Sequence, residues 1–242
     1  MILSRNDIEA ISIGVLNDFN SIFWKKSKIP YCSPQVTPID QFATEYLGLN
    51  ITFYPLCHDG SFCGLTAYAD TEYVLELNGS KYILPLKKNQ IVLDRSFLDP
   101  KRIRTLCGKR RFTLAHECAH QILFQLEADG MKHACRKLYS ERRLYSKREF
   151  KSKLDWNEWQ ADSLAAALLM PSQELSVAMS MYSSNHYVKS FEGKFDEVDS
   201  QLINRLCQIF GVSKSAMCLR LKHLGMLKEL PLSNFFYSKG GS

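Results

Sequence analysis

The sequence lacks the features of secreted disulfide scaffolds and of membrane proteins. It has no C-x-x-C pair, and eight cysteines among 242 residues are too sparse for a small domain held together by disulfides. Its longest apolar run, residues 164–170, is far shorter than the roughly 20 residues that cross a bilayer. Asp7 and Glu9 interrupt the N-terminal stretch where a signal peptide would have an apolar core. We therefore expect a cytoplasmic protein with reduced thiols and no membrane partner.

Compositional bias is absent as well. Hydrophobic residues make up 45% of the chain and charged residues 23%, which excludes collagen, low-complexity disorder and mucin-like stalks. The length fits one large domain, or a domain with a small appendage, and is sufficient to bury a core.

The formal net charge of +6 is modest but unevenly distributed. Residues 101–111 contain six Lys or Arg and no acidic residue, and residues 132–153 contain nine against Glu141 and Glu149. The rest of the chain is acidic overall. The simpler interpretation is two solvated, mobile loops. The more specific hypothesis is a positive rim that steers an acidic partner to a cleft.

Hydrophobic periodicity predicts an α+β fold. Between residues 50 and 93 the segments are short and rich in β-branched and aromatic residues, so we expect a small, mostly antiparallel sheet packed on helices. Asn78-Gly79 is typical of a hairpin turn. The expected strands are 50–54, 65–69, 72–77, 81–86 and 90–93. The expected helices are 7–19 with Asp7 as N-cap, 38–47, 112–126, 156–169 with Asp155 as N-cap, one starting at 172, 199–210 and 213–224.

The same pattern suggests a division of the chain into four parts. They are an N-terminal helix and connector (1–37), a main domain (38–190), a C-terminal helical subdomain (191–232) and a tail (233–242).

The C-terminal pair of helices resembles a helix-turn-helix with the turn at residues 211–213. Lys214, Arg220 and Lys222 give the second helix basic character, but apolar residues crowd it. We expect these helices to complete a core, and we do not expect direct DNA binding.

The most specific motif is H-E-x-x-H at residues 116–120, within a helical, apolar-periodic stretch. The spacing places His116 and His120 on one helix face, a turn apart, where they can bind one metal ion. Neutral imidazoles suit Zn²⁺, although this donor set leaves Mn²⁺ or another divalent metal open. Glu117 lies off the ligand axis, so we expect it to take a proton from water that the metal activates. The alternative is an exposed, charged helix face.

A catalytic zinc takes three protein ligands, so another helix should supply the third. Glu158 is the candidate, and Asp162 follows one turn later on the same face. We expect Glu158 to ligate the metal and Asp162 to accept a hydrogen bond from a ligand imidazole, which fixes its tautomer. The alternatives are a solvated glutamate at a helix start and a surface aspartate. The core-type sequence of residues 164–169 favours an inward-facing first turn.

Two segments together resemble the ImmA/IrrE family of bacterial metallopeptidases. They are R-F-T-L-A-H-E at residues 111–117 and E-x-x-A-D-x-x-A-x-x-L-L-M-P at residues 158–171. The resemblance covers about residues 38–227 and implies a zincin-like fold of the gluzincin type.

The resemblance also implies roles for individual residues. His116, His120 and Glu158 fall on metal-ligand positions and Glu117 on the catalytic position. Family members cleave helix-turn-helix repressors, so the implied partner is a repressor of that class. The alternative function is a non-proteolytic metal-binding regulator that binds a repressor or DNA. The oligomeric state stays open.

The sequence departs from the family pattern in the middle of the motif, where Cys118 and Ala119 replace the usual Leu/Ile-Gly. Both are small and suit a helix core. No residue can be assigned to stabilise the oxyanion of a peptidase. The candidates by residue type alone are His133, Tyr139, Tyr145 and His186.

Overall fold

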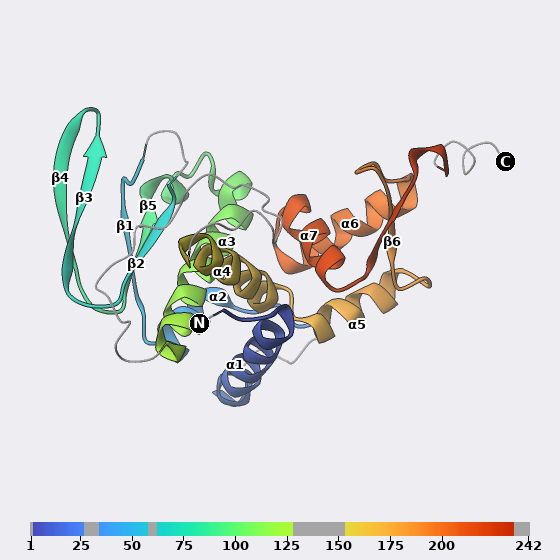
Figure 1. Ribbon diagram of the computed structural model, residues 1–242, viewed down its shortest axis with the longest axis horizontal. Coiled ribbons are helices and arrows are strands. Elements are labelled where there is room, and N and C mark those ends of the chain that lie inside the picture. Colours follow the sequence, from blue (N-terminus) through green and yellow to red (C-terminus); the bar gives the residue numbers. More distant parts are fainter. Residues whose placement is uncertain (1, 27–33, 58–61, 128–152, 235–242) are drawn as a thin grey trace.

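The computed structural model describes residues 2–26, 34–57, 62–127 and 153–234 (Figure 1). The first helix, α1 (Arg5–Lys26), extends beyond the predicted 7–19 in both directions. Asp7 is not its N-cap. It lies in the first turn, where its carboxylate accepts from the backbone N–H of Ser4 at 2.8 Å, and its own N–H donates to Ser4 Oγ at 3.2 Å. Ser4 and Asp7 thus form a reciprocal cap at the helix start.

The predicted helix over residues 38–47 is present, but its hydrogen bonds change along its length. The short α2 (Ile39–Gln41) continues into η1 (Phe42–Tyr46), a π-helical turn. The N–H of Leu47 donates to the carbonyl of Phe42 at 3.0 Å, and Gly48 follows in a left-handed conformation (φ 65°) that ends the helix.

The five predicted strands are all present, and they divide between two sheets. β1 (Asn50–Tyr54), β5 (Gln90–Asp94) and β2 (Gly64–Ala67) form a three-stranded sheet in the order β1-β5-β2. β1 runs parallel to β5, and β2 runs antiparallel to it. β3 (Thr71–Leu77) and β4 (Ser80–Leu86) form a separate antiparallel hairpin. Its turn is Asn78-Gly79, with positive φ at both residues as the dipeptide predicts.

Two central helices lie beside the three-stranded sheet (Figure 1). η2 (Arg95–Leu98) leads from β5 to α3 (Ile103–Leu126), which packs against both the sheet and α4 (Lys153–Leu169). Gln121 of α3 fixes β2 by donating from Nε2 to Thr66 Oγ1 at 2.6 Å and to the Ala67 carbonyl at 3.1 Å. α4 starts at Lys153, so Asp155 lies inside its first turn and is not the N-cap.

The first basic segment is helical, because α3 starts at Ile103 and not at residue 112. The interpretation of residues 101–111 as a mobile loop is therefore wrong. Arg110 donates to both carboxylate oxygens of Asp40, at 3.1 and 2.6 Å, and Arg111 donates to the carbonyl of Thr37 at 3.1 Å. Two of the six basic side chains thus anchor α3 to α2 and to the segment before it. The second basic segment, 132–153, lies almost entirely outside the described residues.

The C-terminal part contains α5 (Ser172–Tyr182), β6 (Val188–Phe191), α6 (Glu197–Phe210), α7 (Lys214–His223) and β7 (Leu227–Leu230). The strands β6 and β7 were not predicted. In the sequence β6 precedes α6 and β7 follows α7, and the two strands pair in parallel. The predicted helix pair is confirmed, with Asp196 and Ser213 as the N-caps and Gly211 (φ 62°) ending α6.

One apolar core joins the N-terminal, central and C-terminal helices. It includes Phe19 of α1, Leu114 of α3, Leu168 of α4, Leu206 of α6 and Leu221 of α7, all buried. The fold class is therefore α+β, as predicted. No helix in the described part of the chain has the length and apolar character needed to span a membrane.

Candidate metal centre

The two histidines of the motif lie midway along α3, where the helix is enclosed by α4 and by the sheet. His116 and His120 are both buried, as is every other residue from 113 to 122 in this helix. The one-turn spacing brings their rings to a centroid separation of 4.5 Å, with the two Nε2 atoms 2.9 Å apart. The predicted shared face of the helix is therefore present.

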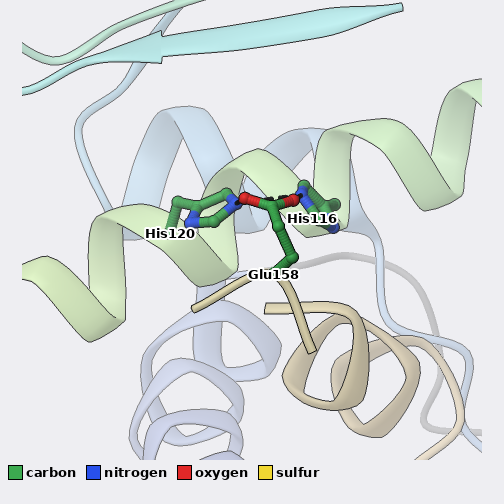
Figure 2. A group of neighbouring side chains, drawn as sticks. All are labelled: His116, His120 and Glu158. Carbon is green, nitrogen blue, oxygen red and sulfur yellow. Dashed lines mark hydrogen bonds and ion pairs between the residues drawn. The ribbon is translucent and has the colours of Figure 1, made fainter. Parts of the chain in front are cut away.

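Glu158 of α4 completes the group, and Figure 2 shows its carboxylate directed at both imidazoles. Its Oε2 lies 3.4 Å from His116 Nε2, and its Oε1 lies 3.6 Å from His120 Nε2. Donors about 2.0–2.2 Å from a tetrahedral zinc lie roughly 3.3–3.5 Å from one another. Two of the three separations fit that geometry closely, and the third is somewhat shorter. The three residues can therefore hold one divalent metal ion.

Asp162 lies one turn beyond Glu158 on α4 and contacts the far side of the His116 ring. Its Oδ1 is 2.9 Å from His116 Nδ1, so the carboxylate accepts a hydrogen bond from Nδ1–H. That bond leaves the Nε2 lone pair directed toward Glu158 and His120, as a metal ligand requires. The structure thus brings together the four side chains that the sequence analysis named: His116, His120, Glu158 and Asp162.

The surroundings of His116 favour positive charge. Burial by itself disfavours the imidazolium ion, but the hydrogen bonds with Asp162 and Glu158 outweigh it and raise the pKa of His116 to about 10. A buried imidazole pair between two carboxylates is an environment that stabilises a cation.

The carboxylate of Glu117 lies next to strand β2 of the sheet. It is fully buried, and neither carboxylate oxygen has a hydrogen-bond partner among the described residues. Burial raises its pKa to about 8, with His116 opposing that shift and Glu158 adding to it. An ionisable group that is buried without a partner is costly, and such groups concentrate at catalytic sites.

Gly64 of β2 is a residue of the site that sequence reasoning missed. A Cβ atom built on it would lie 2.7 Å from Glu117 Oε1 and 2.6 Å from Thr113 Cγ2. The strand therefore runs directly against the Glu117 carboxylate. The only sequence signal was a glycine directly before the predicted strand 65–69, which can indicate a close approach of another group but does not identify that group.

Cys118 and the candidates for the oxyanion role fall outside this group. Cys118 is fully buried, and burial raises the pKa of its thiol, so it stays protonated and packs in the core with Ala119. His186 is exposed between α5 and β6, with Nδ1 3.3 Å from Ser180 Oγ. The other three candidates for the oxyanion role lie outside the described residues: His133, Tyr139 and Tyr145.

Two histidines and a glutamate as donors, with a second glutamate beside them, are the donor set of a metallopeptidase of the gluzincin type. Comparison with known families agrees. Residues 107–222 match the family Peptidase_M78, described as the IrrE N-terminal-like domain. The resemblance to the ImmA/IrrE family is thereby confirmed, and the mixed helical and sheet architecture is that of a zincin-like peptidase domain. No curated protein matches the chain in a sequence search.

Proposed function

We propose that the protein is a zinc-dependent endopeptidase that cleaves a helix-turn-helix transcriptional repressor in the cytoplasm. In this proposal His116, His120 and Glu158 hold the zinc, Asp162 orients His116, and Glu117 is the general base and acid. The observation that carries it is the buried, unpartnered carboxylate of Glu117 beside a three-donor metal group.

Zinc, when bound, supplies a Lewis acid that polarises the scissile carbonyl and lowers the pKa of a coordinated water to about 7. Glu117 takes the proton of the attacking water, because its oxygens are committed to no other partner. The same carboxyl group then delivers that proton to the amine that leaves, which regenerates the carboxylate. A side chain held inside the protein suits this role, since solvent does not compete for the proton.

In this proposal the substrate peptide binds in an extended conformation along the three-stranded sheet. β2 is at one edge of the sheet in the described structure, and Gly64 brings this edge next to Glu117. The carbonyl of Cys63 accepts from the N–H of Asp94, so these two residues form a hydrogen-bonded pair. Hydrogen-bonded and non-hydrogen-bonded pairs alternate along an antiparallel ladder, so the N–H and C=O of Gly64, the next residue, point away from β5. A peptide that pairs with this edge would meet Gly64 beside the base, but all four residues of β2 are buried, so pairing requires the edge to be uncovered first.

The family relationship supports a repressor as the substrate, and the packing of α7 argues against DNA as a direct ligand. Met217, Arg220 and Leu221 of α7 are buried, and Arg220 donates inward to the carbonyl of Met170 and to Glu9. A recognition helix must present such side chains to the major groove, and α7 presents them to the core.

The substrate proposal is tested by co-incubation of the zinc-loaded protein with helix-turn-helix repressors from the same genome, beginning with any that is encoded next to its gene. We expect one or a few cuts in the repressor, mapped by mass spectrometry. Addition of a chelator should abolish the cleavage, and an unrelated helix-turn-helix repressor should stay intact. A repressor that binds the zinc-loaded protein tightly but is never cut would favour the non-proteolytic regulator instead.

A further inference from the structure

Gly64 occupies a position where the backbone itself has no need of glycine. Its φ lies outside the left-handed region that favours glycine, unlike Gly48, Gly79 and Gly211. Glycine inside a strand weakens the strand, because it lacks a side chain that packs and loses more entropy on folding. The reason for a glycine here must therefore lie in what surrounds the missing side chain.

Two side chains of α3 occupy that space. Thr113 and Glu117 are one turn apart on the helix face that meets β2, and both are buried. A Cβ atom at position 64 would lie 2.6 Å from Thr113 Cγ2, 2.7 Å from Glu117 Oε1 and 3.2 Å from Glu117 Cγ. The first two separations are shorter than real Cβ atoms show, and the third is tighter than an ordinary van der Waals contact.

The Glu117 carboxylate has no hydrogen bond from a described residue that fixes it. Its place is set by the helix that carries it and by the strand against which it lies. We propose that Gly64 is a positioning residue for Glu117, since it leaves the space in which the carboxylate stands ready for proton transfer. This inference rests on the proposed peptidase function and deepens it.

A methyl group at position 64 displaces the carboxylate by several tenths of an ångström. Displacements of about 1 Å in a reacting group cost on the order of 100-fold in rate. We therefore expect Gly64→Ala to lower kcat about 10- to 100-fold. KM and zinc content should stay near their wild-type values, because neither the metal ligands nor the backbone polar groups of β2 change.

Two further variants separate positioning from mere packing. Thr113→Ser removes Cγ2. It therefore relieves the collision between the new Cβ and Thr113 and leaves the collision with Glu117 in place. Glu117→Asp shortens the base, so that its carboxylate withdraws from position 64. In the positioning account Thr113→Ser restores little of the kcat lost in Gly64→Ala. In the same account, the fold-loss of kcat caused by Gly64→Ala is at least three times smaller in the Glu117→Asp background than in the wild type.

The experiment measures kcat, KM and zinc per chain for these single and double variants. The control is Gly108→Ala, also a glycine-to-alanine change in this domain, whose Cβ would meet only ordinary contacts at 3.5 Å or more. The control should keep wild-type kinetics. If Gly64→Ala does not fold, the double variants with Thr113→Ser and Glu117→Asp, which have more room, carry the comparison.

The outcomes distinguish this inference from the proposed function. Wild-type kcat in Gly64→Ala, full rescue by Thr113→Ser, or unfolding of every Gly64 variant would each overturn the positioning role while the peptidase stands. A zinc-loaded wild type without peptidase activity would overturn both.

Discussion

Removal of the Asp162 carboxylate should weaken zinc binding although Asp162 never touches the ion. Asp162 accepts the Nδ1–H of His116 at 2.9 Å and so holds the imidazole in the tautomer that binds through Nε2. Loss of such a partner costs roughly 10- to 100-fold in metal affinity, and each tenfold corresponds to about 1.4 kcal/mol. The Asp162 side chain is 52% exposed, and solvent screens its charge, so we expect the lower end of that range.

The two substitutions at this position should differ. Asp162→Ala removes both the acceptor and the charge, and we expect about tenfold weaker zinc binding. Asp162→Asn keeps an acceptor oxygen and loses only the charge, so its loss should be smaller. Competition with a chromophoric chelator at pH 7 measures both dissociation constants. Glu197→Ala, an exposed carboxylate on α6, serves as control and should bind zinc as the wild type does. Unchanged affinity in Asp162→Ala would refute the supporting role of this carboxylate.

The remaining predictions concern stability. Arg220→Ala should destabilise the fold by about 3 kcal/mol in urea unfolding, because it leaves Glu9 and the Met170 carbonyl without their buried partner, whereas exposed Lys222→Ala should cost little. Burial, with the nearby positive charges, lowers the pKa of His223 to about 4 from 6.5. Its neutral form therefore stabilises the fold fully above pH 6.5, and this contribution is lost as pH falls from 6.5 toward 4. Unfolding at pH 7 and pH 4.5 should show a smaller acid-induced loss in His223→Gln than in the wild type, and equal losses would contradict the assignment.

The metal group could be predicted from the sequence because helical periodicity alone fixes most of its geometry. His116 and His120 share a helix face by their spacing, and so do Glu158 and Asp162. The one long-range step, from α3 to α4, came from the ligand count of a catalytic zinc and from the family pattern. The structure agrees with this step, since both helices are present and pack against each other.

The contribution of the sheet could not be predicted in the same way. Gly64 meets Glu117 only because β2 packs across α3, and no local pattern encodes that contact. β6 and β7 were missed for a related reason. They are four-residue strands that pair in parallel across two helices, without the turn that marks a hairpin.

The structure of the first basic segment, residues 101–111, was predicted wrongly for a different reason. Its charge suggested a solvated loop, whereas Arg110 and Arg111 attach the start of α3 to Asp40 and to the Thr37 carbonyl. A charged side chain with a long apolar stem can either stay solvated or bind a partner elsewhere in the fold. Which of the two occurs depends on whether the fold brings a partner within reach, and the local sequence does not show this. Within this segment, the steering hypothesis for a positive rim therefore loses the charges of Arg110 and Arg111.

The central claim, that Glu117 is the general base of a zinc peptidase, is tested most directly by cleavage assays on the wild type and Glu117→Gln. Both proteins are first shown to hold the same amount of zinc per chain. The account predicts that the wild type cleaves its repressor substrate and that the variant, with its ligands intact, is slower by 100-fold or more, on the order of what a general base contributes. A zinc-loaded Glu117→Gln protein that cleaves at the wild-type rate would contradict it.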